Sequence, residues 1–350
     1  MVSPLSASLA LSMTYNGANG QTEIEFEDVL GYEGFTTEEI NTVNRNIIDG
    51  LTSGNDNTTF DIANSIWYRD GFTVKQDFVD DNQTYYRAEV QSLDFNDPNS
   101  VNIINNWVSD NTQEKIPTII NNIPAEAVMY LINALYFKST WQYEFDPDAN
   151  VMRDFYDENG TSLGEKEMMK QQADLKYYTH EDVFTSVKLP YKSGKFEMIL
   201  FKPQTDKTTD DIITAMSGTA WQAWRANYAE EKVVVTMPKF KFDYKKQLKD
   251  DLITMGMPSA FEESSADFTD INSNERLFIS KVLQKTFIDV NEEGSEAAAV
   301  TAVTVVLEST DNNQELATHF TLDQPFVFMI TDKTTNSICF VGKVGNPDYQ

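Results

Sequence analysis

The order of helical and strand patterns along the chain limits its possible folds more than any other feature. Apolar residues at helical spacing lie at 5–13, a capping box Thr36-x-x-Glu39 opens a helix through Ile48, and another helix includes Trp107. Strand patterns then dominate, at 128–137, 183–189, 196–201, 233–237 and 326–330, with strict alternation at 239–243. A later helix is expected at 245–255, closed by Gly256. Because strands and helices do not alternate regularly, we expect an α+β fold, and without a repeat or linker a single domain over 1–350.

One segment has no clear local preference. Residues 294–299 begin with small side chains that suit a helix, whereas residues 300–306 are rich in valine and threonine and suit a strand.

Composition excludes several classes of function. The 350 residues are 41% hydrophobic, enough for a large core, and carry 27 basic against 55 acidic side chains, a net charge of −28. This charge repels polyanions, so we expect neither nucleic acid nor a heparin-like polyanion as a partner. Cys339, the only cysteine, lies in an apolar run and is expected to be buried; with only His180 and His319 besides, no metal or other cofactor is expected. No apolar run is long enough to span a membrane, and the first residues show no secretion signal.

One motif suggests a hydrolase but stands in the wrong context. Residues 160–164 match G-x-S-x-G, in which the serine must sit between a buried strand and a helix. Here a polar turn precedes it, so we expect a hairpin and no enzyme.

Several segments resemble the serpins, in the family's order. Residues 291–299, Asn-Glu-Glu-Gly-Ser-Glu-Ala-Ala-Ala, resemble the hinge of the reactive loop in inhibitory members. The segments at 3–6, 105–116, 131–141, 237–240, 323–328 and 340–347 are similar to other family motifs, so the resemblance covers Ser3 to Pro347. It implies a metastable fold of three β-sheets and about nine helices, with the hinge and exposed reactive loop at 292–320. The family's first helix is expected to be missing, and we expect a prokaryotic member.

The resemblance also implies a function. We expect an inhibitor of serine-type proteases, with cysteine proteases as a further class of target, in which the cleaved loop inserts into a sheet and traps the protease covalently. A monomer acting outside the cell or at its surface is expected. The alternative within the family is a non-inhibitory carrier or chaperone, and the alternative outside it is a secreted hydrolase.

The resemblance assigns roles to particular residues. The hinge comprises Glu292, Gly294, Ser295, Glu296, Ala297, Ala298 and Ala299. The breach, where the loop enters the sheet, comprises Lys239, Glu292 and Trp141. The shutter beneath the opening sheet comprises Ser3, Ser6, Asn133 and Gln284, where Gln284 stands in place of the family's frequent histidine. The reactive bond is expected at Glu308-Ser309, with Val306 and Leu307 as alternative sites of attack.

The loop itself can be tested for insertion as a strand, because alternate side chains of a strand face opposite sides. Glu296 must face solvent, so the inward set is Ser295, Ala297, Ala299, Thr301, Val303 and Val305. None is charged and none is proline, as a strand buried in the middle of a sheet requires.

Overall fold

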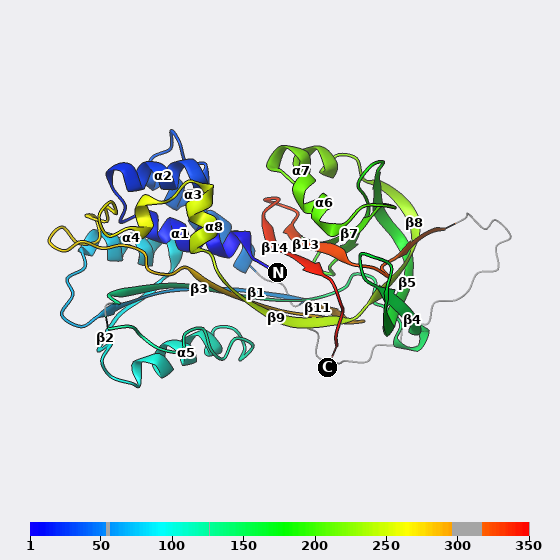
Figure 1. Ribbon diagram of the computed structural model, residues 1–350, viewed down its shortest axis with the longest axis horizontal. Helices are drawn as coiled ribbons and strands as arrows, with labels where there is room; N and C mark the ends of the chain where they lie inside the picture. Colours follow the sequence, from blue (N-terminus) through cyan, green and yellow to red (C-terminus); the bar gives the residue numbers. More distant parts are fainter. Residues whose placement is uncertain (54–56, 126, 296–316, 350) are drawn as a thin grey trace.

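Two β-sheets with flanking helices make up the computed structural model, which describes residues 1–53, 57–125, 127–295 and 317–349 (Figure 1). These residues form eight α-helices and two short 3-10 helices. The helices are α1 (Pro4–Tyr15), α2 (Gly20–Leu30), α3 (Thr37–Thr52), α4 (Gln76–Tyr86), α5 (Ser100–Asp110), α6 (Thr209–Ala215), α7 (Gly218–Arg225), α8 (Lys249–Met255), η1 (Pro147–Ala149) and η2 (Ser259–Phe261). The expected helix over Thr36–Ile48 is confirmed as α3, with both bonds of its capping box formed.

The first sheet has six strands in the order β2-β1-β3-β11-β10-β9. Helix α5 covers one face, and α1 to α4 with α8 lie on the other (Figure 1). The strands are β2 (Glu89–Leu93), β1 (Thr58–Arg69), β3 (Met129–Thr140), β11 (Gly294–Ser295), β10 (Leu283–Val290) and β9 (Phe240–Gln247).

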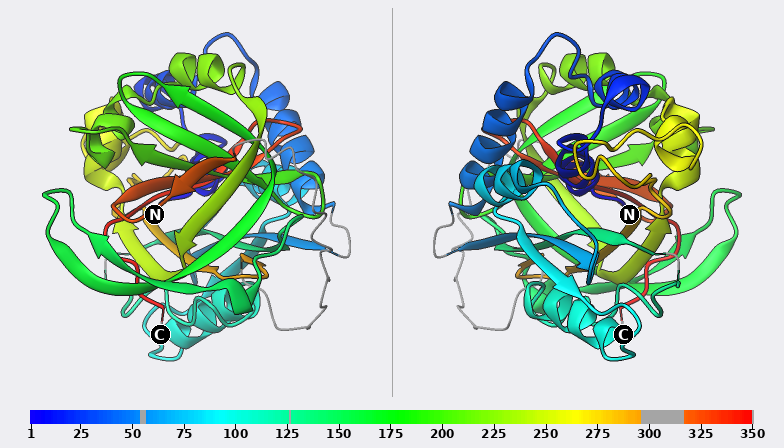
Figure 2. Two further views of the ribbon diagram at one scale, coloured as in Figure 1. Left: turned by 90° about the vertical axis from the view of Figure 1, so that its right-hand side faces the viewer. Right: turned by 90° about the vertical axis from the view of Figure 1, so that its left-hand side faces the viewer.

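The second sheet has eight strands, in the order β12-β8-β5-β6-β7-β13-β14 with β4 paired to β5. Figure 2 shows this strongly curved sheet end on. The strands are β4 (Val151–Tyr156), β5 (Ser162–His180), β6 (Phe184–Pro190), β7 (Phe196–Pro203), β8 (Ala229–Pro238), β12 (Thr318–Thr321), β13 (Phe326–Asp332) and β14 (Ile338–Val344).

The α+β class is as expected, but the described residues form two sheets rather than three. The 19-residue strand β5 explains the difference, because it pairs with β8 over Met168–Tyr177 and with β6 over Lys176–His180. Strand β5 therefore joins β8 on one side and β6 on the other into one continuous sheet.

The expected helix at 245–255 is wrong in its first part. Lys245, Lys246 and Gln247 extend β9 and pair with β10, and α8 begins only at Lys249. The ladder satisfies the backbone groups of these residues, and this tertiary pairing outweighs their helix propensity. The end of the helix is as expected: Gly256 adopts a left-handed conformation with φ 118°.

The main core lies between the two sheets and is rich in aromatic side chains. Phe137 of β3 packs edge-on against Phe196 of β7, and Phe240 of β9 contacts Phe328 of β13, with ring centroids 5.3 Å apart in both pairs. Cys339 is fully buried in this core, as expected, and burial raises the pKa of its thiol. The six-stranded sheet is thus packed on one face by strands β7 and β13 of the second sheet.

Candidate functional site

The first residues of the expected hinge already lie inside the six-stranded sheet. Gly294 and Ser295 form β11, in which they pair with Thr140 and Ser139 of β3, and Ser295 also pairs with Val290 of β10. A two-residue strand thus occupies the top of the space between β3 and β10. The remaining hinge residues, Glu296, Ala297, Ala298 and Ala299, and the expected reactive bond with its alternatives, Val306, Leu307, Glu308 and Ser309, lie outside the described residues.

Gly294 is required at its position by a close backbone approach. A Cβ atom there would lie 2.1 Å from the carbonyl oxygen of Ser139 and 2.8 Å from the Cα of Thr140. Neither backbone atom can move aside cheaply, so only glycine lets the chain enter the sheet against β3.

Ser295 is anchored to a buried aromatic pair. Its side chain is 2% exposed, and its hydroxyl lies 2.5 Å from the Tyr191 hydroxyl. The Tyr191 ring stacks on Trp141 with centroids 4.6 Å apart. Trp141 in turn donates its backbone N–H to the Glu293 carbonyl (2.8 Å) and its indole N–H to the Asn291 carbonyl (2.9 Å). The tryptophan therefore holds both ends of the turn that leads into β11.

The expected breach pair, Lys239 and Glu292, is in contact. Lys239 Nζ lies 3.1 Å from Glu292 Oε1 and 2.8 Å from Glu167 Oε2. Asn150 Nδ2 donates to both carboxylates, at 2.6 Å to Glu292 and 2.8 Å to Glu167. Four side chains, from the connection before β4, from β5, from the residue after β8 and from the expected hinge, therefore form one network. Sequence reasoning missed Asn150 and Glu167, because nothing distinguishes them in a chain with 55 acidic residues and abundant asparagine.

The network is partly buried, and this changes the acidity of its members. Burial lowers the pKa of Lys239, but hydrogen bonds to Glu167 and Glu292 outweigh it, so the pKa lies above its ordinary value. The same hydrogen bond from Lys239, with one from Asn150, lowers the pKa of Glu167. Next to the network, burial and the neighbouring carboxylates of Glu144 and Glu292 raise the pKa of Glu293. The network therefore holds Lys239 charged and Glu167 ionised.

Three of the four expected shutter residues meet at the start of α1. Gln284 accepts from the backbone N–H of Ser3 (2.9 Å) and donates to its carbonyl (2.8 Å). The Ser3 hydroxyl caps α1 by accepting from the Ser6 N–H (3.1 Å) and donates to the Cys339 carbonyl (2.6 Å). Glutamine satisfies this buried position because it is both donor and acceptor.

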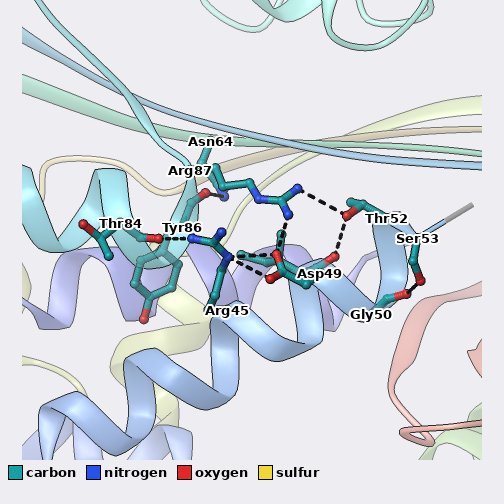
Figure 3. Close-up of polar contacts among 10 residues, drawn as sticks. Arg45, Asp49, Gly50, Thr52, Ser53, Asn64, Thr84, Tyr86 and Arg87 are labelled. Carbon is teal, nitrogen blue, oxygen red and sulfur yellow. Dashed lines mark hydrogen bonds and ion pairs between the residues drawn. The ribbon is translucent and has the colours of Figure 1, made fainter.

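Asn133 has a different partner from the one expected. It donates to the side chain of Asn64 on β1 (2.6 Å), and its own Oδ1 is buried without a hydrogen-bond partner in the described part of the chain. Asn64 in turn donates to the Tyr86 carbonyl (2.7 Å) at the end of α4 (Figure 3). Because paired residues of β1 and β3 share one face, Asn64 directly opposite Asn133 is the nearer partner.

Two arginines fasten α3 to the end of α4, next to Tyr86 (Figure 3). Arg45 and Arg87 both bind Asp49, at 2.8 Å and 2.5 Å. Arg45 also donates to the Thr84 carbonyl. The side chains of Arg45, Asp49 and Arg87 are each more than a third exposed, so they form a group of surface ion pairs rather than a buried ion cluster.

The hydrolase motif lies in a hairpin, as expected. Asp157 accepts two backbone N–H bonds at 2.8 Å in the turn between β4 and β5, and the hydroxyl of Ser162 donates to Asp154 (3.0 Å). In the ranges that the structure describes, no three His, Cys, Asp or Glu side chains are grouped to hold a metal, and no helix is long and apolar enough to cross a membrane.

A six-stranded sheet with the short strand β11 between β3 and β10 agrees with the family that the comparisons find. Residues 1–347 match the family described as "Serpin (serine protease inhibitor)". The chain is 34% identical to intracellular coagulation inhibitor 2 of Tachypleus tridentatus, covering 98% of this chain and 84% of the relative. It is 32% identical to an uncharacterized serpin-like protein of Methanosarcina acetivorans, covering 100% and 82%. The native structure of the thermophilic serpin tengpin superposes with a TM-score of 0.90 at 32% identity, covering 99% of this chain and 88% of tengpin.

The chain therefore belongs to the serpin family, whose named members include protease inhibitors.

Proposed function

We propose that this protein inhibits serine-type proteases as a suicide substrate, within one domain over 1–350 whose hinge and reactive loop span 292–320. The observation that carries the proposal is β11, since Gly294 and Ser295 near the start of the loop pair with β3 and can extend that pairing strand-wise after cleavage. On the side of β3 that faces β10, the described strands pair only at Ser139 and Thr140. The rest of this edge of β3 is where an inserted strand would add its ladder.

The register of β11 indicates how such a strand would lie. Extending the pairs Gly294↔Thr140 and Ser295↔Ser139 places Thr301 opposite Asn133. Ser295 is buried, so every second residue after it would also face the core, and these are the uncharged residues of the sequence pattern. Thr301 would then bring a hydroxyl donor to the face that holds the unpaired Oδ1 of Asn133. Insertion would satisfy a buried acceptor that is unsatisfied before it.

The comparison with two forms of tengpin supports the proposal. The chain superposes on native tengpin with a TM-score of 0.90 and on latent tengpin with 0.85. The similarity is thus greater to the form described as native than to the form described as latent.

The deciding experiment mixes the protein with subtilisin-like, elastase-like and trypsin-like proteases. We expect a denaturant-resistant complex at the summed mass with at least one of them, and none with the same protease lacking its nucleophilic serine. Cleaved inhibitor with fully active protease in every mixture would refute trapping and favour the alternative of a non-inhibitory carrier. One solved neighbour, thyroxine-binding globulin in complex with thyroxine, has a TM-score of 0.86 at 27% identity.

The site of attack is proposed from the count of residues after the hinge. Sixteen positions after Glu292 is Glu308, so the bond Glu308-Ser309 would be cleaved; Val306 and Leu307 remain alternatives for an elastase- or subtilisin-like pocket. Sequencing the fragment released from a trapped complex decides: a new N-terminus at Ser309 supports Glu308, one at Glu308 supports Leu307, and one outside residues 306–310 contradicts the count.

We propose a protease as the partner, without a polyanion, and a setting outside the producing cell or at its surface. The net charge of −28 disfavours a heparin-like polyanion, and a secreted or surface-exposed monomer would meet foreign proteases first. One relative is named an intracellular inhibitor, so fractionation of the producing cells is the test of location.

A further inference from the structure

A cavity of about 210 Å³ opens between β3 and the segment that leads into β10, far along β3 from β11. Its walls come from α1, from the start of β3, from the chain before β3, and from residues 276–283 that lead into β10. The segment 276–283 is held on its other side, where Ile279 N–H bonds to the Ala260 carbonyl (2.8 Å) and the Val282 carbonyl accepts from Leu248 (2.9 Å). The cavity is therefore bounded by fixed secondary structure.

The walls of the cavity are apolar and only partly covered. Leu11 of α1 is buried, whereas Met129 and Leu131 of β3 and Leu277 and Ile279 of the opposite segment are half-buried and pack against the same core cluster. Phe278, also in the lining, is 40% exposed. A half-open apolar cavity of this kind gains stability from an apolar guest.

Two cations stand at the edge of the cavity. Arg276 and Lys281 are among its lining residues, both are exposed, and within the described ranges neither has an ion-pair partner. By contrast, Lys285 on the neighbouring strand β10 is paired with Asp243. The chain has twice as many acidic as basic side chains, so two cations without ion-pair partners in the described residues are unusual. Next to an apolar cavity, they can bind the charged end of an amphipathic anion.

We propose that this cavity binds the apolar chain of a medium-length alkyl carboxylate, with the carboxylate held between Arg276 and Lys281. The cavity volume equals the volume that about seven water molecules occupy in the liquid. A cavity of this volume accommodates an alkyl chain of roughly six to eight carbons. The carboxylate is ionised at neutral pH and stays at the wet rim, where its desolvation cost is small.

Binding has a consequence that rests on the proposed function. The cavity lies between β3 and the segment before β10, on the path that an inserting strand would follow. An occupied cavity would oppose insertion, so octanoate would shift the products of a protease reaction from trapped complex toward cleaved inhibitor.

Calorimetric titration without protease tests the site itself, so its result does not depend on whether the protein traps proteases. With octanoate below its micellar range, we expect saturable binding with one site, and hexanoate should bind about fifteenfold more weakly because two buried methylenes are lost. Octyltrimethylammonium should bind least, since the rim carries positive charge.

Variants separate the apolar cavity from the cationic rim. Arg276→Gln with Lys281→Gln should weaken octanoate binding about three- to tenfold and leave octanol binding unchanged. The matched control, Arg153→Gln with Lys170→Gln, removes the same charge from strands β4 and β5 of the second sheet, outside the cavity lining, and should have no effect. Ala10→Met should fill the cavity and abolish binding of both octanoate and octanol. Equal affinity for octanoate and octyltrimethylammonium, or octanoate binding that survives both the rim and the cavity variants, would overturn the proposal.

Discussion

Lys239→Ala provides a direct test of the network at the entrance to the sheet. The Lys239 side chain is 15% exposed and bonds to Glu292, which is 13% exposed, and to Glu167, which is 47% exposed. A hydrogen bond to a charged, largely buried group contributes about 1.5–3 kcal/mol, and the exposed partner adds under about 1 kcal/mol. We therefore expect the free energy of unfolding to fall by about 2–3 kcal/mol, part of it from leaving the Glu292 carboxylate with Asn150 as its remaining side-chain donor.

The network also joins the hinge to β5 and β8, so its loss should ease movement of the loop. If these contacts are broken in the transition state for loop movement, the rate of spontaneous insertion or polymer formation on warming should rise by up to about 160-fold. Urea unfolding followed by tryptophan fluorescence measures the stability, and native gels after warming measure the rate. Lys176→Ala is the control, because its pair with Glu230 is exposed (51% and 67%) at 3.3 Å. Indistinguishable results for Lys239→Ala and Lys176→Ala would refute the reasoning.

The pH dependence gives the same test an internal check. The pKa of Glu167 is lowered in the folded protein, so its contribution is complete above about pH 5 and lost as pH falls through the lowered value. The pKa of Lys239 is raised, so its contribution is complete below about pH 10 and lost as pH rises through the raised value. The stability difference between wild type and Lys239→Ala should therefore be largest between these limits and shrink at both ends.

Three further variants test the hinge, the shutter and the inward face of the loop. Gly294→Ala should displace β11 from β3 and speed amide hydrogen exchange along that strand edge, whereas Gly345→Ala, with nothing within 4 Å of its added Cβ, should not. Gln284→Glu keeps an acceptor but loses its donor and buries a charge, so thermal unfolding should show a loss of about 2–4 kcal/mol. Thr301→Arg should convert the inhibitor into a substrate by placing a charge on the inward face, while Ala302→Arg should be mild; equal yields of trapped complex from both would disprove the assigned alternation.

The features that could be predicted from the sequence are those that short-range chemistry determines. The capping box at Thr36 fixes the start of a helix wherever the chain goes, and alternation at 239–243 identifies a strand with one buried face. The pair Lys239–Glu292 was predicted from a family resemblance rather than from spacing, because the two residues are 53 positions apart and no local pattern links them.

The features that could not be predicted depend on tertiary pairing. Lys245 has a helical sequence context but lies in a strand, because its backbone pairs with β10. Asn133 bonds to Asn64 because β1 and β3 pair in one particular register. Asn150 completes the Lys239 network from the short connection before β4, although its sequence context is that of an ordinary surface turn. Each outcome depends on which strand lies opposite, and local preference does not specify this.

The hydrogen bond from Ser3 to Cys339 constrains when the protein can fold during its synthesis. Its two residues are 336 positions apart, and Val2 likewise pairs with Val341 on β14. At about 5–20 residues per second, the ribosome needs roughly 20–70 s to supply the second residue after the first. Throughout that time the start of α1 lacks its Cys339 acceptor, and the core lacks the buried strand β13. Nascent chains of this protein should therefore expose apolar surface until translation is almost complete, and chains arrested before β13 should bind chaperones and be cleaved readily by protease.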